Sequence, residues 1–366
     1  MNKKQKRAAE AAAATLAAQR EAESVENFEW RDDGFQLCGL SHIKADVNFQ
    51  AQSFWRDARI RFMRNKGAVF ALFCIAAIIL LAILGPMMTG YTYSGQIIAQ
   101  QNLAPRVPGL ENLGIFNGDL TLKTTTGHLV QNGYLEKGFE DVYYWFGSDT
   151  LGRDIWTRTW TGTRVSLYIA LVAVICDMVL GMSYGLISGY FGGKLDTILQ
   201  RIAEVVNSIP TLVIVTLLLI VLEPGLQTIT LALILTGWIG MSRIARAQML
   251  KLKEQEFVLA SRTLGARPRR IIFKEILPNI ISQLITNTMF SIPNAIFTEA
   301  FLSFVGLGVP TPMCSLGSLI NDAYKVFTVY PYQIIPPVVV LALLMMCFNM
   351  LGDGLRDAFD PKMKQM

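Results

Sequence analysis

The sequence predicts an all-α polytopic membrane protein with about six transmembrane helices and a sizeable connection between the first and second. Of its 366 residues, 52% are hydrophobic and 17% are charged, and its mean hydropathy is +0.38. A soluble domain of this composition would leave too much apolar surface in water. Because a transmembrane helix needs about 20 mostly apolar residues, six stretches qualify: Gly67–Met88, Val165–Tyr190, Val205–Leu222, Leu226–Ser242, Gln283–Val305 and Gln333–Gly352.

The fifth stretch is the least sharply bounded. Apolar sequence continues from Ile276 to Asn321, and Glu299 is the one charged residue in it. This length accommodates one crossing together with a re-entrant or surface segment.

The positions of the basic residues predict which segments face the cytoplasm. Segment 1–66 contains twelve Lys/Arg residues and segment 243–274 contains nine, whereas the connection 90–164 contains six together with seven acidic residues. Because cytoplasmic segments carry an excess of Lys and Arg, we expect the tail 1–66 and the loop 243–275 inside, and the connection 90–164 outside. Helix 67–89 is the first of the six crossings, and the core over 165–352 contains the other five. An even number of crossings returns the carboxyl-terminal tail 353–366 to the cytoplasm.

The amino-terminal segment has two parts. Residues 1 to about 26 are rich in Ala, Glu and Gln and lack an apolar face, so we expect a mobile cytoplasmic tail. The stretch Phe54–Arg64 alternates aromatic residues with arginines. It is typical of an interfacial helix near anionic headgroups, or of the charged flank of the first span.

The outer connection ends in a polar motif immediately before the second span. Asp149 is placed to cap a following helix, and Gly152 permits close backbone approach. The motif is interpreted either as a capped helix on the outer membrane surface or as a contact for a protein that delivers substrate. Its candidate residues are Gly147, Asp149, Gly152, Arg153 and Asp154.

The loop between the fourth and fifth spans is longer than a simple connection requires. Glu256 suits the positive end of a short helix, Ala260 offers a small surface, and Gly265 is placed to end the helix in a left-handed conformation. A second amphipathic stretch follows, with three arginines opposite Ile271, Ile272 and Phe273. The alternative is a basic loop that only fixes topology. The candidate coupling residues are Glu256, Ala260, Ser261, Leu264, Gly265, Ala266, Arg267 and Pro278.

Three positions inside the membrane are candidates for pathway or gating roles: Asp177, Pro210 and Glu299. A charge at the centre of a span costs about 2.5–3.5 kcal/mol on insertion scales unless it faces protein or water, so we expect Asp177 to face the helix bundle. A proton-coupled secondary transporter also uses such a carboxylate, and it is the rival hypothesis. Pro210 removes a backbone donor and permits a kink. Glu299 is interpreted as a residue of the pathway mouth or an ordinary interfacial carboxylate.

Several kinds of chemistry are not expected of this chain. His42 and His128 are its only histidines, and its five cysteines show no CxxC spacing, so we expect no metal site and no catalytic triad. The run Gly192-Gly193-Lys194-Leu195 lacks the first glycine and the hydroxyl residue of a nucleotide-binding P-loop. We therefore expect no cofactor in this chain and no nucleic-acid partner.

A set of short motifs extends over nearly the whole chain. The motifs are Phe54–Arg59, Arg64–Lys66, Gly147–Asp154, Ser188–Lys194, Asn207–Pro210, Glu256–Asn279, Glu299–Gly308, Gly352–Asp357 and Asp360-Pro361. Together they resemble the permease subunits of the dipeptide/oligopeptide/nickel class of ABC importers. Two positions depart from that pattern: Ser261 stands where the loop motif often has alanine, and Lys274-Glu275 where histidine is common.

The resemblance implies a type I permease fold in a bacterial cell membrane, with both termini cytoplasmic. It implies a second homologous permease, two ATPase subunits that bind ATP and Mg²⁺, and an extracytoplasmic binding protein that delivers peptides. The long outer connection favours oligopeptides or dipeptides over nickel or another small solute. A scaffold or sensor is the remaining alternative, although no signalling domain is visible in the sequence.

Overall fold

The computed structural model describes residues 54–124 and 127–359, and the expected mobile tail at 1–26 lies outside this part of the chain. The bundle and its two ends are built from the helices α2 (Phe54–Arg64), α3 (Lys66–Leu84), α5 (Ile155–Phe191), α6 (Gly193–Asn207), α7 (Thr211–Val221), α8 (Leu226–Leu252), α9 (Glu256–Thr263), α10 (Pro268–Arg270), α11 (Leu277–Leu302), α12 (Leu316–Tyr324) and α13 (Ile335–Phe359). A π-helical segment, Ile271–Ile276, joins α10 to α11, and a second one, Ser303–Leu307, follows α11.

Five helical segments of the described chain are long and apolar enough to cross a membrane, and α6 with α7 makes a sixth if that bent pair is one span. The third predicted span, Val205–Leu222, is broken near its start, because α6 ends at Asn207 and α7 begins at Thr211, with a bend of 79° between them. Pro210 lies at this break and precedes the first turn of α7, where its missing N–H costs no helical hydrogen bond.

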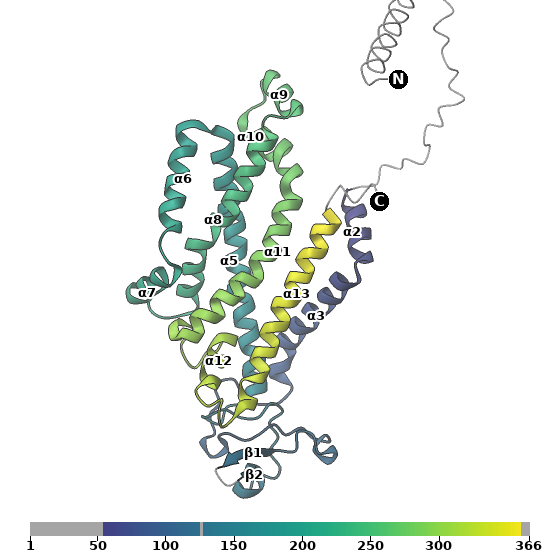
Figure 1. Ribbon diagram of the computed structural model, residues 1–366, viewed down its shortest axis with the longest axis vertical. Coiled ribbons are helices and arrows are strands. Elements are labelled where there is room, and N and C mark those ends of the chain that lie inside the picture. Colours follow the sequence, from purple (N-terminus) through teal and green to yellow (C-terminus); the bar gives the residue numbers. More distant parts are fainter. Residues whose placement is uncertain (1–53, 125–126, 360–366) are drawn as a thin grey trace, which may run out of the picture. The chain divides into compact units, whose positions relative to one another are not determined.

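The two ends of the described bundle carry different segments (Figure 1). Helix α9, the amino-terminal helix α2 and the end of α13 lie at one end, here called the coupling end, and β1 and β2 lie at the opposite end, the hairpin end. This grouping matches the predicted grouping of cytoplasmic and outer segments. Which end faces the cytoplasm stays a prediction.

Several helices extend beyond the predicted spans. Helix α5 begins at Ile155 and has 37 residues, which at 1.5 Å per residue is about 55 Å and exceeds the hydrocarbon thickness of a bilayer. Helix α8 continues ten residues past Ser242, and α13 continues past Gly352 to Phe359. The apolar composition therefore located the membrane part of each helix, and the helices continue through their polar flanks.

The outer connection contains β-structure that an all-α prediction does not include. Strands β1 (Asp119–Thr124) and β2 (Gly127–Asn132) pair antiparallel, and the short helix α4 (Gly133–Lys137) follows. A small core of Leu103, Tyr134 and Tyr144 lies beneath them. The Tyr134 hydroxyl donates to the Ala104 carbonyl at 2.8 Å and the Tyr144 hydroxyl to Gln100 Oε1 at 2.5 Å, so burial of these two polar atoms is compensated.

Helices α5 and α11 are central, because both contribute to all three apolar clusters of the bundle. The first cluster joins them to α3 and α13, which lie side by side (Figure 1). The second joins them to α8 and α9, and the third to α7 and α8. A displacement of α9 therefore acts on the same two helices that line the middle of the bundle.

Glycines bring α5 and α8 into close contact. Gly181, Gly185 and Gly189 recur every four residues on α5, and a β-carbon at Gly185 would lie 2.2 Å from the Ser242 carbonyl oxygen of α8. Such a stripe of small residues permits backbone-to-backbone packing in membranes. Asp177 lies four residues before Gly181, on the same face of α5. The close packing of the glycines therefore also fixes the position of Asp177 relative to α8.

Helix α12 accounts for the long apolar stretch after the fifth span. Ser315 caps it, accepting from the Ser318 N–H while the Ser318 hydroxyl accepts from the Ser315 N–H. Gly317 lies so close to α11 that a β-carbon there would be 2.3 Å from the Ala300 carbonyl oxygen. This stretch therefore forms one crossing and a short packed helix at the hairpin end, as one reading of the sequence expected.

Candidate functional site

The predicted short helix in the 243–275 loop is confirmed. Helix α9 begins at Glu256 and ends at Thr263. Gly265 follows with a φ of 78°, a left-handed conformation that glycine adopts without steric cost. The Ala266 N–H donates to the Ser261 carbonyl at 3.0 Å and the Gly265 N–H to the Arg262 carbonyl at 2.9 Å, which completes a carboxyl-terminal cap.

Three contacts hold α9 against the bundle. Val258 is fully buried in the cluster formed by α5, α8, α11 and the π segment. The Arg262 guanidinium lies 5.1 Å from the centre of the Tyr190 ring at the end of α5, within range of a cation–π interaction. The Lys253 Nζ donates to the Gly189 carbonyl at 3.1 Å, so the connection between α8 and α9 is also attached to α5.

The face of α9 that points away from the bundle is exposed and includes apolar side chains. Phe257 and Leu259 are 43% and 47% exposed, and Leu264 is 88% exposed. A cavity of about 370 Å³ adjoins this face, and it brings together five predicted coupling residues with two others: Ser261, Leu264, Gly265, Ala266, Arg267, Arg270 and Glu275. Clustered apolar side chains at the water-facing end of a membrane protein indicate a protein contact.

The other predicted coupling residues lie outside this cavity. Glu256 and Ala260 are exposed on α9, and Pro278 lies in the first turn of α11. The expected apolar face of the following stretch is only partly correct, because Ile271 and Ile272 are buried but Phe273 is 53% exposed. The π-helical geometry of Ile271–Ile276 rotates this side chain away from the core that an ideal helix would bring it to.

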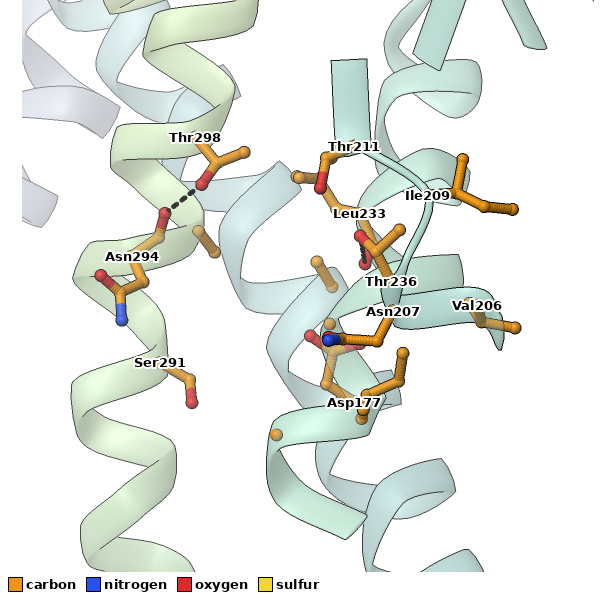
Figure 2. Close-up of a pocket in the computed structure, with 15 residues that line it drawn as sticks. Asp177, Val206, Asn207, Ile209, Thr211, Leu233, Thr236, Ser291, Asn294 and Thr298 are labelled. Atoms are coloured by element: carbon orange, nitrogen blue, oxygen red, sulfur yellow. Dashed lines mark hydrogen bonds between the residues drawn. The ribbon is translucent and has the colours of Figure 1, made fainter. Parts of the chain in front are cut away.

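A second cavity, of about 360 Å³, lies within the bundle between α5, the α6–α7 break, α8 and α11. Figure 2 shows Ser291 and Thr298 of α11 on one side and Asp177 with Thr236 on the other. Its lining mixes apolar side chains with polar ones: Asp177, Asn207, Thr211, Thr236, Ser291, Asn294 and Thr298. Polar side chains exposed at membrane depth face protein partners or water-filled pathways.

Asp177 faces the bundle as predicted, and a glycine makes room for it. A β-carbon at Gly237 of α8 would lie 1.9 Å from Asp177 Oδ2. The carboxylate therefore occupies the space that a side chain at position 237 would fill. It is the acidic residue of the cavity lining.

The other two candidate pathway residues have different surroundings. Pro210 lies at the α6–α7 break, between the cavity residues Ile209 and Thr211. Glu299 is fully buried away from the cavity, where Ser166 and Ser303 donate to its two oxygens at 2.6 and 2.8 Å. The interpretation of Glu299 as a residue of a pathway mouth is thus wrong for this conformation, because its carboxyl group joins α5 to α11.

Sequence reasoning missed the polar face of α11. Gln283, Asn287, Ser291, Asn294 and Thr298 are spaced by four, four, three and four residues, which places them on one side of a helix. The last three line the cavity of Figure 2, and the first two line another cavity of about 410 Å³ nearer the coupling end. Their spacing was the available signal, but uncharged residues in an apolar stretch do not interrupt a hydropathy window.

At the hairpin end, the predicted outer motif forms a buried ion-pair cluster. Arg153 Nε lies 2.6 Å from Asp149 Oδ2, and the Arg158 and Arg153 guanidinium groups lie 3.8 and 3.6 Å from Asp322 Oδ2 of α12. Arg153 and Arg158 are 3% and 1% exposed. The two carboxylates balance the two cations and join the outer connection, α5 and α12.

The prediction that Asp149 caps a surface helix is wrong. Asp154 is the cap of α5, and it accepts from the Thr157 N–H at 3.0 Å. Burial raises the pKa of the Asp154 carboxyl above its ordinary value, and hydrogen bonds from Thr157 and Thr89 oppose that rise. Asp149 instead accepts from the backbone N–H groups of Leu151 and Arg153.

The two glycines of the motif are required by close contacts. Gly147 and Gly152 have φ values of 84° and 70°, and a β-carbon at Gly152 would lie 1.9 Å from the Ile97 carbonyl oxygen. Because Arg153 and Asp154 are also buried, this motif builds the interior of the outer region. Its side chains are not placed to form a surface contact for a delivering protein.

The comparisons with known proteins agree with this architecture. Residues 181–365 match the binding-protein-dependent transport system inner membrane component, and residues 53–105 match the N-terminal TM domain of oligopeptide transport permease C. The chain belongs to this family of ABC importer permeases. The first match contains α9, the π segment and the cavity lining from Val206 onward, whereas Ala173 and Asp177 lie just before it, and the second match contains α2 and α3.

Curated relatives resemble this permease over most of its length. It is 40% identical over 319 residues to the oligopeptide transport system permease protein OppC of Bacillus subtilis, covering 87% of this chain and 93% of that one. It is 37% identical over 336 residues to the dipeptide transport system permease protein DppC of the same organism, covering 91% and 94%. Among solved structures, the MetNI methionine ABC transporter is 20% identical with a TM-score of 0.47, over 55% of this chain and 96% of that chain.

Proposed function

We propose that this permease forms half of the pathway through which an ATP-driven importer admits oligopeptides or dipeptides into a bacterial cell. A second homologous permease forms the other half, and an extracytoplasmic binding protein delivers the peptide. Two partner subunits bind ATP and Mg²⁺ and hydrolyse the ATP. In this proposal the coupling end faces the cytoplasm and the hairpin end faces outward.

The observation that carries the proposal is the combination of a clamped face and an exposed face on α9. Val258 is fully buried among residues of α5, α8 and α11, whereas Leu264 is 88% exposed at the end of the same helix. A partner that binds the exposed face moves the bundle through the buried one. Changing a two-state bundle from 1:99 to 99:1 takes about 5.5 kcal/mol of differential binding, for which ATP hydrolysis by a docked subunit is a sufficient source.

The choice of peptides as substrate is supported by the relatives and by the cavity. The printed names of the two Bacillus subtilis relatives specify oligopeptide and dipeptide transport. Carboxamide and hydroxyl groups, such as those of Asn207, Asn294 and Thr236 in the cavity, both donate and accept hydrogen bonds. They suit the alternating donors and acceptors of a peptide backbone better than the hydration shell of a small inorganic ion.

Isolation of the complex tests the proposed assembly. The tagged chain is extracted from its native membrane in mild detergent, and the proteins that accompany it in stoichiometric amounts are identified by mass spectrometry. We expect a second six-span permease and two ATPase subunits. A lone chain or a self-dimer from gently treated membranes contradicts the proposal.

The docking role of α9 is tested by Gly265→Asp. The variant adds a charged side chain at an exposed left-handed position that faces the proposed ATPase contact. We expect the chain to insert in the membrane, to lose the ATPase subunits during purification and to support no peptide uptake. The matched control is Gly193→Asp, because Gly193 also has positive φ and no neighbour of its β-carbon position within 4 Å. Normal uptake by Gly265→Asp, or equal losses in both variants, refutes the docking role.

A further inference from the structure

The cavity between α5 and α11 contains an acidic group without a compensating charge. Among the described residues that line it, Asp177 is the ionisable one, and the remaining polar lining consists of carboxamides, hydroxyls and backbone. The ion pairs found in the described part of the chain do not include Asp177. A carboxylate at this depth is unfavourable unless a cation or water meets it.

The carboxylate also lacks a hydrogen-bond donor in the described chain. Its Oδ1 atom is buried and unpartnered, and its Oδ2 atom faces the backbone at Gly237. By contrast, Glu299, the other acidic residue of the bundle interior, receives hydroxyl donors on both oxygens. Since buried polar atoms are normally satisfied, a buried oxygen without a partner on a residue that lines a cavity marks a place for an external donor.

The surroundings of Asp177 in the cavity supply neutral hydrogen-bonding groups with free acceptor oxygens and no basic side chain. Thr236 donates its hydroxyl to the carbonyls of its own helix, which leaves its oxygen lone pairs available. The side chains of Asn207 and Asn294 have no hydrogen-bond partner among the described residues. The Thr298 hydroxyl donates to the backbone carbonyl of Asn294 and leaves its side chain free. The Asp177 carboxylate provides one negative charge, and the neighbouring side chains provide several neutral oxygens. This combination suits a ligand group with one positive charge and several N–H donors.

We propose that Asp177 is the subsite that receives the protonated amine of a peptide in transit, its amino-terminal ammonium group in a peptide with neutral side chains. This inference rests on the proposed function. The ammonium group has three N–H donors: the Asp177 carboxylate accepts one and neutralises the charge, and the neutral oxygens of the cavity accept the others. The peptide amine replaces the water that a charged carboxylate otherwise requires in the membrane.

The dimensions and the charge favour this occupant over a divalent metal ion. Ca²⁺ takes six to eight oxygen ligands, and Mg²⁺ demands near-octahedral geometry, usually with carboxylates. Here a single carboxylate is present, and among the described residues no group of three or more His, Cys, Asp or Glu side chains is placed to hold a metal. A cavity of about 360 Å³ is in the range of sites that enclose small organic ligands.

The glycine at 237 gives the subsite its shape. Its missing side chain lets the carboxylate lie against α8, so the cavity side of Asp177 stays open toward α11 (Figure 2). The polar face of α11 opposite provides Ser291 and Asn294 for the peptide backbone that follows the amine. The same face continues to Asn287 and Gln283 toward the coupling end, which gives the departing peptide further polar contacts.

The test measures peptide binding to the purified permease–ATPase complex in the absence of binding protein. The probes are two tetra-alanine peptides with a fluorophore at the carboxyl end, one with a free amino terminus and one N-acetylated, and binding is followed by fluorescence anisotropy. Asp177→Asn removes the charge with little change in shape, and Asp177→Glu retains it. The control Glu223→Gln removes a charge from the exposed turn between α7 and α8.

We expect the free-amine peptide to bind the wild type and Glu223→Gln equally, and at least about tenfold more weakly to Asp177→Asn. Asp177→Glu is expected to retain more of the affinity than Asp177→Asn does. The acetylated peptide is expected to bind wild type and Asp177→Asn alike. Equal binding of the free-amine peptide to wild type and Asp177→Asn overturns the proposal, as does equal affinity of wild type for both peptides or no binding of the free-amine peptide.

A parallel uptake measurement separates this inference from the proposed function. Wild-type complex in proteoliposomes, with its binding protein and ATP, is given the free-amine peptide. Absence of uptake contradicts the peptide-import function itself. Normal uptake together with unchanged binding by Asp177→Asn contradicts only the ammonium subsite.

Discussion

The close contact between α5 and α8 predicts a specific cost for adding one methyl group. In Gly185→Ala, the new β-carbon lies at the position that is 2.2 Å from the Ser242 carbonyl oxygen, 2.8 Å from the Arg246 nitrogen and 2.9 Å from the Ala245 β-carbon. Two of these three atoms belong to the α8 backbone, so a rotamer change cannot relieve the overlap. The helices must separate, and the contacts along the whole glycine stripe weaken.

The expected magnitude follows from this overlap. Adding volume to a well-packed interior costs about 1–3 kcal/mol, whereas the helix propensity of alanine returns about 0.5–1 kcal/mol. We expect a net loss of about 1–2 kcal/mol, which lowers the melting temperature by roughly 1–3 °C for a chain of this size. The melting temperature is measured on the detergent-solubilised complex by loss of the monodisperse peak in fluorescence-detected size-exclusion chromatography.

Gly240→Ala is the matched control. Gly240 lies on α8, and its β-carbon position has no neighbour within 4 Å, so alanine there is expected to leave the melting temperature unchanged or slightly higher. The account of α5–α8 packing fails if Gly185→Ala melts at the same temperature as Gly240→Ala.

Three further changes have expected outcomes. Asp149→Ala leaves two buried guanidinium groups underneutralised and should destabilise the detergent-solubilised protein by about 3–5 kcal/mol, whereas Lys325→Ala removes an exposed pair worth at most about 1 kcal/mol; similar melting temperatures would contradict the buried cluster. Val258→Ala removes the buried anchor of α9, so the ATP hydrolysed per peptide imported should rise. An unchanged ratio in proteoliposomes would contradict the proposal that α9 transmits the movement of a docked subunit to the bundle. Gly237→Ala places a β-carbon 1.9 Å from Asp177 Oδ2 and should reduce uptake several-fold relative to wild type; uptake at the wild-type level would show that the carboxylate position is unimportant.

Features set by neighbouring residues were predictable from the sequence. The helix at Glu256–Thr263 and its left-handed ending at Gly265 follow from local capping chemistry, which requires residues only a few positions apart. The membrane helices follow from long apolar stretches, because bilayer thickness sets their length. The helix at Phe54–Arg64 was one of two interpretations of its alternating aromatic residues and arginines.

Features set by contacts between distant segments were not predictable in the same way. A proline at 210 indicates a break, but the bend of 79° depends on how α6 and α7 pack against α8. The cap of α5 was predicted at Asp149, whereas Asp154 holds it, because the ion pairs that engage Asp149 and Arg153, including that of Arg153 with Asp322, become visible only when α12 is in place. The strands β1 and β2 lie in a stretch whose mixed composition favours neither periodicity.

The cavity was partly predictable. Asp177 was identified because a charge in a span is costly, but its partner position at Gly237 lies on another helix. The glycine spacing on α5 and the polar spacing on α11 were both present in the sequence. The function of each spacing can be interpreted only when the helix that faces it is known.

ATP-dependent peptide uptake tests the central claim most directly. The complete complex, isolated with its partners, is placed in proteoliposomes with the binding protein outside and ATP supplied to the ATPase subunits, and a labelled peptide is followed into the lumen. The account predicts uptake that stops when ATP is removed and continues when an uncoupler collapses the proton gradient. Uptake that stops with the uncoupler while ATP remains would contradict it and would support the proton-coupled alternative centred on Asp177.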